Sequence, residues 1–472
     1  MSQNQKIDIT RLIDEKKIDA FSIKLLIFSF IIFLFDGYDT GAIAFAAPDL
    51  LKAWHITNRA ALGPVFSASL FGVLIGAPIF GYIGDRFGRK KAIIACCLTF
   101  GLFTWAVVLA GSLDDVFYLR FFAGIGIGGL LPNVIALNAE YAPKRYRATM
   151  IIVMFTGYPL GTGSPGLLTA WLVPQYGWTI LFWIGGVVPI VAAVAVFLWM
   201  PESLKYLVVK YGRRAEAEVV ALLARVKPGM AVAPDAQFLV PDESQFKGFS
   251  PQHLFRDGLA FITPLLWFCF AMNLMGYYFL ISWMPTLLTT SKVLSSTSAA
   301  LATTLLQVGG TLGSLALCRP MDVKGLAPVT VLFAIAVPTI ALIGYASSSE
   351  SLLMIVVFVA GFCVLGLQSG LNAMSGMIYP TAYRSNGSGW AFGIGRFGSV
   401  VGPIVGGFLV GRQLPLEQLF MFAAIPAAFG TVACFALMRL CLAKFGGYSL
   451  GQRDQLDSTL SHGAASGGNP SR

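Results

Sequence analysis

Five ionisable side chains lie inside long apolar stretches of this 472-residue chain, where a charge is costly. A charged group at the centre of a membrane helix costs roughly 2.5–3.5 kcal/mol by insertion measurements, so such groups usually face a partner, a cavity or an ion path. We therefore expect these side chains to carry most of the chemistry. They are Asp36, Asp39, Arg120, Glu140 and Arg396.

The two aspartates lie deep in the first apolar stretch. Asp36 is about 20 Å along a helix that begins near Ile23, at about 1.5 Å per residue. The i, i+3 spacing places both carboxyl groups on one helix face. Two neighbouring carboxyl groups in apolar surroundings are suited to binding and releasing a proton, and the alternative is a purely structural role. No imidazole competes for this task, because the three histidines lie outside the apolar stretches: His55, His253 and His462.

Arg396 lies about 14 Å into a later apolar stretch, residues 387–411. A guanidinium keeps its proton in proteins and must therefore find an anion. The sequence leaves three partners open: an aspartate of the first stretch, a carboxylate on a substrate, or a remote structural bridge.

Arg120 and Glu140 bracket the fourth apolar stretch and lie about 30 Å apart along a helix, near opposite membrane faces. Glu140 should lie close to the basic loop that follows the second stretch. We expect an ion pair there that keeps this face closed and breaks when the two parts of the protein rock. A static bridge at a helix end is equally compatible with the pattern.

Polar and aromatic side chains near the middle of other apolar stretches are candidates for a substrate pocket. Most aromatic residues in such a chain face lipid or core, which is the alternative for each of them. The candidates besides Arg396 are Tyr38, Asn133, Asn273, Trp283, Gln368 and Asn372.

The elements that must position these residues are membrane helices. Hydrophobic residues make up 56% of the chain and charged residues 12%, and the mean hydropathy is +0.73. A soluble domain is nearer a quarter charged. This composition excludes a disordered chain, a fibrous repeat and a nucleic-acid module. The net charge of +10 does not indicate a polyanionic partner, because the basic residues cluster in short loops between apolar stretches.

At about 20 residues per crossing, twelve apolar stretches are long enough to span a membrane. The loops that follow even-numbered spans carry nearly all the loop cations, which predicts that both termini are cytoplasmic. We therefore predict an all-α membrane protein of twelve transmembrane helices in two six-helix halves. The spans are residues 23–47, 62–84, 92–111, 116–140, 148–172, 178–200, 259–285, 296–318, 326–346, 351–377, 387–411 and 416–440.

The two halves resemble each other at a shift of 237 residues, the difference between Asp322 and Asp85. The same shift superposes glycines of the second, fourth and fifth spans on glycines of the eighth, tenth and eleventh. Parallel six-helix repeats are typical of secondary transporters with a substrate site between the halves. We predict a first half at 1–200, a cytoplasmic linker at 201–258, a second half at 259–442 and a disordered tail at 443–472.

Enzyme chemistry has no support in the sequence. The G-x-G-x-x-G at Gly124–Gly129 lies inside one apolar stretch, so close helix packing explains it better than dinucleotide binding. Protease, esterase and nucleotide-binding sequences of the HExxH, GxSxG and Walker kinds are missing. The seven cysteines show no disulfide or zinc spacing. We expect no metal and no cofactor.

Two sequence segments resemble the major facilitator superfamily. They are Gly81-Tyr82-Ile83-Gly84-Asp85-Arg86-Phe87-Gly88-Arg89-Lys90 after the second span and Pro201-Glu202-Ser203 after the sixth. Three further segments resemble the aromatic acid:proton symporter family within it. They are Asp36-Gly37-Tyr38-Asp39, Leu131-Pro132-Asn133 with Glu140-Tyr141, and Gly389-Trp390-Ala391-x-Gly393-x-Gly395-Arg396.

This resemblance implies uptake of an aromatic carboxylate with protons across a bacterial inner membrane, for aromatic hydrocarbon catabolism. It implies that Asp36 and Asp39 couple the proton and that Arg396 is essential for transport. The second-half loop, residues 319–325, keeps Asp322 and a glycine but lacks the Arg-x-Gly-Arg tail, so we expect a weaker gate there. The residues expected to act in gating are Asp85, Arg86, Gly88, Arg89, Arg120, Glu140, Asp322 and Arg384.

Other functions stay open on the sequence alone. A porter of a non-aromatic acid such as muconate, a sugar porter and a non-transporting membrane sensor are the alternatives. The sequence does not settle which aromatic acid is carried, the proton stoichiometry or a role in chemotaxis. We expect a monomer without nucleic-acid partners.

Overall fold

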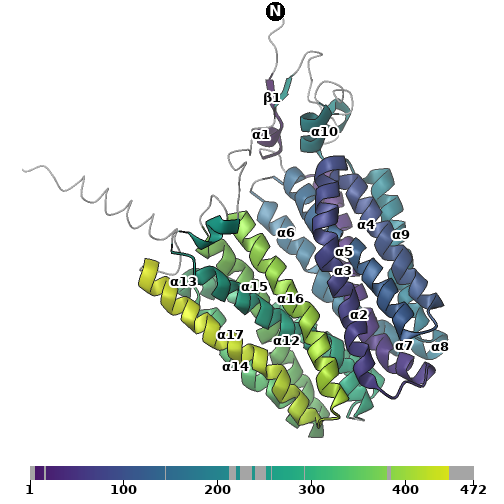
Figure 1. The fold of residues 1–472 in the computed structure, drawn as a ribbon. Helices are drawn as coiled ribbons and strands as arrows, with labels where there is room; N and C mark the ends of the chain where they lie inside the picture. Colours follow the sequence, from purple (N-terminus) through teal and green to yellow (C-terminus); the bar gives the residue numbers. More distant parts are fainter. Residues whose placement is uncertain are drawn as a thin grey trace, which may run out of the picture. The chain divides into compact units, whose positions relative to one another are not determined.

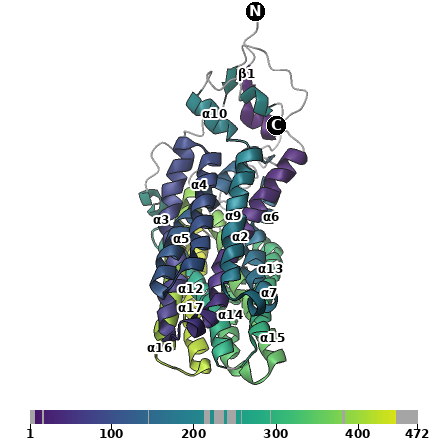
Figure 2. The same ribbon diagram turned by 90° about the vertical axis from the view of Figure 1, so that its right-hand side faces the viewer.

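The computed structural model describes residues 6–14, 18–143, 145–211, 219–223, 237–239, 251–256, 258–291, 293–379 and 384–445. These residues are α-helical apart from a pair of three-residue strands. The chain forms two compact units, residues 1–247 and 248–472. Each unit is built around long apolar helices, as Figures 1 and 2 show.

Among the described residues, eleven helices are long and apolar enough to cross a membrane. Five of them belong to the first unit: α2 (Ala20–Ala53), α3 (Leu62–Phe87), α4 (Arg89–Ala106), α5 (Leu113–Tyr141) and α9 (Thr179–Trp199). Six belong to the second: α12 (Ile262–Thr290), α13 (Ser296–Lys324), α14 (Ala327–Tyr345), α15 (Glu350–Ile378), α16 (Arg384–Gly411) and α17 (Leu416–Phe445). The short helices are α8 (Val173–Tyr176), η1 (Arg59–Ala61), η2 (Val107–Leu109), η5 (Pro251–Phe255) and η6 (Ala346–Ser348).

The fifth predicted span is not one continuous helix. It divides into α6 (Arg147–Phe155) and α7 (Gly157–Trp171), with Thr156 between them. Pro159 lies in the first turn of α7, where its ring would clash with the carbonyl of Phe155 in an unbroken helix and its nitrogen has no hydrogen to donate. At the break, the backbone N–H of Thr156 bonds the Val153 carbonyl instead, at 3.2 Å.

Glycines bring α2 and α7 into backbone contact. A Cβ atom added at Gly37 or Gly41 of α2 would collide with the carbonyl oxygen of Tyr158 or Thr162. A Cβ atom at Gly161 of α7 would in turn collide with the carbonyl of Leu34. The two helices therefore pack more closely than any larger residue at these positions would permit.

The same packing joins α3 to α5 and explains the G-x-G-x-x-G sequence. Gly124 of α5 lies against the Ser69 carbonyl of α3, and Gly72 and Gly76 of α3 lie against carbonyls of α5. The other two glycines of the sequence also make close contacts, Gly126 with the backbone of α4 and Gly129 with side chains of α3 and α4. The interpretation of this sequence as a helix-packing stripe is confirmed.

In the second unit, the contacts follow the predicted repeat. Helix α12 packs against α16 as α2 packs against α7, and α13 packs against α15 as α3 packs against α5. Gly398 lies against the carbonyl of Ala271, and both numbers exceed those of the pair Gly161 and Leu34 by 237.

A small subdomain lies beyond the helix ends of the first unit, where β1 (Lys6–Asp8) and β2 (Gln237–Leu239) form a parallel pair. Helix α1 (Ile9–Asp14) follows β1, and α10 (Leu204–Tyr211) follows the last long helix of the unit (Figure 1). The buried residues that join them into one hydrophobic cluster with Tyr141 of α5 are Ile9, Leu12, Ile13, Leu204, Leu207, Val219, Leu222 and Leu223. The described linker residues up to 239 therefore pack onto the first unit, whereas residues 251–256 belong to the second.

Candidate functional site

A buried ion pair joins α2 to α5 in the first unit. Asp39 is fully buried and Arg120 is 1% exposed, and Arg120 Nη1 lies 2.6 Å from Asp39 Oδ1. Arg120 Nη2 also donates to the backbone carbonyl of Asp39 at 3.2 Å. A guanidinium and a carboxylate without access to water are stable only when they are paired and hydrogen-bonded. The contact therefore fixes both side chains in place.

A third helix contributes to this pair through Thr104 of α4. The Thr104 hydroxyl is buried and donates to Asp39 Oδ1 at 3.0 Å, so both donors meet the same oxygen. The other oxygen, Asp39 Oδ2, and the Arg120 Nε atom are buried and have no hydrogen-bond partner among the described residues. A carboxyl group held by one oxygen has the other available to accept a proton.

The ion pair lies toward the end of the unit where α2 ends and α5 begins. Asp36 lies one helical turn earlier on α2 and is 9% exposed. Tyr38, between them, is buried and donates its hydroxyl to the Leu181 carbonyl of α9 at 2.9 Å. Its hydroxyl is therefore bonded within the unit, and its role in substrate binding stays a prediction.

The opposite end of the unit holds five of the predicted gating residues, together with Glu202 and Ser203, whereas Arg120 belongs to the ion pair with Asp39. The five are Asp85, Arg86, Gly88, Arg89 and Glu140. We name Asp85, Gly88, Arg89, Asn133, Glu140, Glu202 and Ser203 the linker-end cluster. Arg89 forms an ion pair with Asp85 and donates to Asn133 Oδ1 at 3.2 Å. Asn133 Nδ2 donates to the carbonyls of Phe80 and Gly129. The amide of Asn133 is therefore part of this cluster, and its role in substrate binding stays a prediction.

Glu202 lies in the segment after α9 and joins this segment to the start of α4. Its Oε1 accepts hydrogen bonds from the backbone N–H groups of Lys90 and Ser203, at 3.0 and 2.9 Å. A carboxylate at the first turn of α4 satisfies unpaired N–H groups and complements the helix dipole. Gly88 adopts φ 108° just before α4, and a Cβ atom there would meet the Glu202 carboxylate. Both the positive φ and the close approach of the Glu202 carboxylate therefore require glycine at position 88.

Glu140 and Arg86 also make contacts at this end. The Ser203 hydroxyl donates to Glu140 Oε2, whereas the predicted ion pair of Glu140 stays a prediction. Arg86 Nη1 donates to the Tyr82 hydroxyl at 2.6 Å. The Arg86 carbonyl accepts a hydrogen bond from Lys210 Nζ of α10 at 2.5 Å. The linker is therefore bonded to the loop that the sequence marks as a gate.

In the second unit, polar side chains connect α12 to α15. Asn273 Nδ2 donates to Gln368 Oε1 at 3.0 Å, and Gln368 Nε2 donates to Asn372 Oδ1 at 3.4 Å. On α12 and α13, Gln307 Nε2 donates to the Tyr277 hydroxyl at 3.3 Å, while Gln307 Oε1 is buried without a hydrogen-bond partner among the described residues. These amides can recognise a polar group on a ligand.

Arg396 of α16 is the cation of the second unit that the sequence singled out. Its Nη1 atom is buried without a hydrogen-bond partner among the described residues, and its guanidinium lies 5.0 Å from the centre of the Phe392 ring. Stacking on an aromatic face orients the guanidinium but supplies no anion. The site therefore retains capacity to bind a negative group.

Trp283 is bonded within its own unit, and its role in substrate binding stays a prediction. It is fully buried, and its Nε1–H donates to the Pro403 carbonyl of α16 at 3.0 Å. The tryptophan thus joins α12 to α16. The side chains of Asp322 and Arg384 lie outside the part of the chain that the structure describes.

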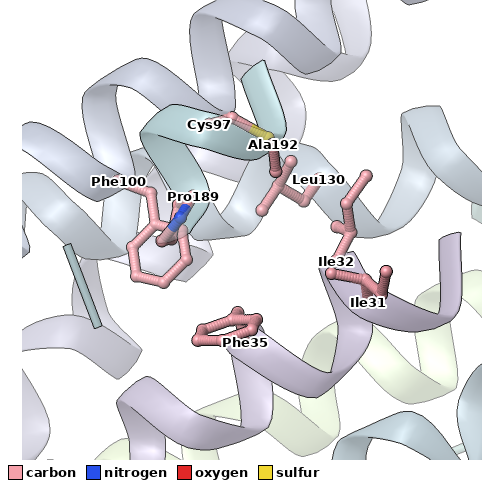
Figure 3. Close-up of a pocket in the computed structure, with 8 residues that line it drawn as sticks. All are labelled: Ile31, Ile32, Phe35, Cys97, Phe100, Leu130, Pro189 and Ala192. Carbon is pink, nitrogen blue, oxygen red and sulfur yellow. The ribbon is translucent and has the colours of Figure 1, made fainter. Parts of the chain in front are cut away.

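A pocket of the first unit is lined by apolar side chains of α2, α4, α5 and α9 (Figure 3). Such a lining takes up apolar groups and offers nothing to bind a carboxylate. The described residues contain no group of three or more His, Cys, Asp and Glu side chains that would hold a metal ion. The pocket residues are Ile31, Ile32, Phe35, Cys97, Phe100, Leu130, Pro189 and Ala192.

Two residues of these contacts were not singled out from the sequence: Thr104 and Gln307. An isolated hydroxyl or amide in an apolar helix carries no local signal of its partner. The pairing of Asp39 with Arg120 was also missed, although depth arithmetic supplied a clue. Asp39 lies near the end of the first predicted span and Arg120 near the start of the fourth, so both belong to the same membrane side of the predicted topology.

Comparisons with known proteins agree on one family. The Major Facilitator Superfamily model matches residues 29–316 and 266–454. A gallate transporter of Pseudomonas putida is 36% identical over 431 residues, covering 91% of this chain and 95% of that protein. The 4-hydroxybenzoate transporter PcaK of Acinetobacter baylyi is 36% identical over 438 residues, covering 92% and 95%.

Solved structures share the fold at low sequence identity. A bacterial homolog of the human lysosomal transporter Spinster, in an inward-facing conformation, matches with a TM-score of 0.69 and 16% identity, over 91% of this chain and 99% of that one. The xylose transporter XylE from E. coli matches with a TM-score of 0.64 and 14% identity, over 90% and 99%.

Proposed function

The chain belongs to the Major Facilitator Superfamily, and we propose that it takes up an aromatic carboxylate together with a proton by alternating access of its two halves. The superfamily and these relatives are transporters and not enzymes. The curated relatives carry gallate, 4-hydroxybenzoate or benzoate by name, which supports an aromatic acid as the substrate class.

The observation that carries this proposal is the state of Arg396. A half-buried guanidinium has one buried nitrogen without a hydrogen-bond partner among the described residues, and a phenyl ring lies against its face. A benzoate-type anion offers both a carboxylate for the nitrogen atoms and a ring that packs beside Phe392. A neutral sugar satisfies only part of this site.

Proton coupling is supported by the buried carboxyl groups of α2. Moving an anion inward against an inside-negative potential costs about 2.3 kcal/mol per 100 mV, and one proton carried along cancels that charge. Asp39 has an available oxygen, and Asp36 lies one turn away. Protonation from outside, binding at Arg396 and release of both inside complete the cycle.

The proposal extends to topology and gating. We count α6 and α7 as one broken crossing, which makes twelve crossings with both termini in the cytoplasm of a bacterial inner membrane, as a monomer. The linker-end cluster then lies on the cytoplasmic side. Its ion pair between Arg89 and Asp85 and its capping carboxylate Glu202 hold that side together until the halves move.

The test is uptake of labelled 4-hydroxybenzoate into proteoliposomes, with competition by unlabelled gallate, benzoate, muconate and glucose. We expect the aromatic acids to compete and Arg396→Gln to abolish uptake, because the carboxylate loses its cation. Arg412→Gln is the matched control, since Arg412 also stacks on a phenylalanine ring but is exposed. If only muconate or only glucose competed with the uptake, the proposed aromatic substrate class would be wrong.

A further inference from the structure

We propose that Thr104 is a positioning residue for proton coupling: its hydroxyl holds Asp39 Oδ1 and so assigns the transported proton to Asp39 Oδ2. This inference rests on the proposed proton-coupled function and adds the atom that takes the proton and the residue that selects it. Thr104 lies on α4, outside the segments whose sequence suggested a function.

The two oxygens of Asp39 have different surroundings. Oδ1 accepts from Arg120 Nη1 at 2.6 Å and from the Thr104 hydroxyl at 3.0 Å. Arg120 Nη2 donates to the backbone carbonyl of Asp39 at 3.2 Å, which ties the guanidinium to the helix. Two donors from two helices thus define one orientation of the carboxyl plane.

Oδ2 is buried and has no hydrogen-bond partner among the described residues. A buried acceptor without a partner is unfavourable, and a proton on Oδ2 turns it into a hydroxyl while Oδ1 keeps both of its hydrogen bonds. The neighbouring Tyr38 hydroxyl is engaged with the Leu181 carbonyl, and Asp36 lies one turn away on the same helix. The geometry therefore distinguishes the two oxygens before any proton arrives.

Without the Thr104 hydroxyl, Oδ1 keeps a single side-chain donor, and the carboxyl group can rotate about its bond to Cβ. Protonation then occurs on either oxygen, including the one that Arg120 needs in the deprotonated state. Binding of the aromatic acid in the other half does not depend on this choice. The defect should therefore appear in coupling and not in substrate exchange.

Thr104 also packs, and its methyl group lies near Gly185 of α9. Two substitutions separate the roles of its two branches. Thr104→Val keeps the shape and removes the hydroxyl, whereas Thr104→Ser keeps the hydroxyl and removes the methyl group. Thr169→Val is the control, because the buried Thr169 hydroxyl of α7 donates only to the Pro165 carbonyl of its own helix in the described contacts.

The experiment compares two measurements on the full-length protein in proteoliposomes with 4-hydroxybenzoate. Counterflow exchange needs no net proton movement, whereas accumulation driven by a pH gradient does. For Thr104→Val we expect exchange within about twofold of wild type and accumulation reduced about tenfold, the factor that a hydrogen bond to a charged group is worth. Thr104→Ser and Thr169→Val should match wild type in both measurements.

Equal loss of exchange and accumulation in Thr104→Val would overturn the inference, and so would a defect of Thr104→Ser with normal Thr104→Val, since both results indicate packing alone. Wild-type behaviour of Thr104→Val in both measurements would overturn it as well. A failure of the proposed function looks different, because wild-type protein would then show no accumulation of the aromatic acid in a pH gradient.

Discussion

The two halves of the molecule share a packing plan and differ in their charges. Helix pairs and glycine contacts repeat at a shift of 237 residues, and Gly88 and Gly325, which follow α3 and α13, both have positive φ. The residues of the buried ion-pair site do not repeat. At the same shift, Asp39, Thr104 and Arg120 correspond to Gly276, Ala341 and Val357. The duplicated backbone therefore holds the titratable site in one half only.

The reverse difference occurs at Arg396. Its counterpart in the first half is Pro159, the residue that divides the fifth span, whereas α16 is continuous through Arg396. Asp36 corresponds to Asn273, an amide of similar shape that does not titrate and that bonds Gln368. In the mechanism proposed above, proton chemistry therefore belongs to the first half and anion binding to the second.

The largest expected effect comes from breaking the feature that the halves do not share. Arg120→Gln leaves the Asp39 carboxylate buried without its cation, and we expect the free energy of unfolding to fall by about 3–5 kcal/mol. Denaturant unfolding of the purified protein in detergent measures this loss. The double variant Asp39→Asn/Arg120→Gln should recover most of it, since no charge then remains buried. A double variant as unstable as the single one would mean that the ion pair is not the cause.

The next largest loss of stability is expected at the glycine contacts that the two halves share, and it should be the same in both halves. Gly161→Ala and Gly398→Ala each place a methyl group against a backbone carbonyl, of Leu34 and Ala271, and overpacking of this kind costs about 1–3 kcal/mol. Thermal unfolding should show similar losses for the two variants. Gly81→Ala is the control, because no atom lies near its added Cβ. Losses of thermal stability that differ strongly between Gly161→Ala and Gly398→Ala would contradict the shared packing plan.

The smallest stability change is expected at position 36, where Asp36→Asn gives the first half the amide of the second. The shapes match, so we expect the free energy of unfolding to change less than in either of the preceding sets of variants. Uptake driven by a pH gradient should nevertheless be lost, because an amide carries no proton. Undiminished pH-dependent accumulation by this variant would remove Asp36 from the coupling site.

The sequence predicted the helices and the repeat well because both depend on local hydropathy and spacing. The depths of Asp36 and Arg396 in the membrane, obtained from the rise along a helix, stay predictions. The break in the fifth span was not predicted, because its apolar stretch is long enough for one continuous helix despite Pro159. The pairing of β1 with β2 joins segments more than 200 residues apart, and no local pattern signals three residues of strand.

Side-chain roles were harder to predict because residue type does not reveal where a polar atom points. Asn133 and Trp283 have the chemistry of ligand contacts, yet both bond carbonyls within their own half. Thr104 looks like any small residue of an apolar helix until the rotation of α4 places its hydroxyl against Asp39. Helix rotation is set by packing over the whole half, which spacing along one helix cannot supply.

The proposal that the first half couples the proton and the second half binds the anion is tested most directly by measuring proton entry and substrate entry together. Proteoliposomes that hold a pH-sensitive dye receive labelled 4-hydroxybenzoate under a fixed membrane potential. We expect wild-type protein to acidify the interior in step with uptake, Asp39→Asn to exchange substrate without moving protons, and Arg396→Gln to move neither. Proton entry coupled to uptake in Asp39→Asn would contradict the account.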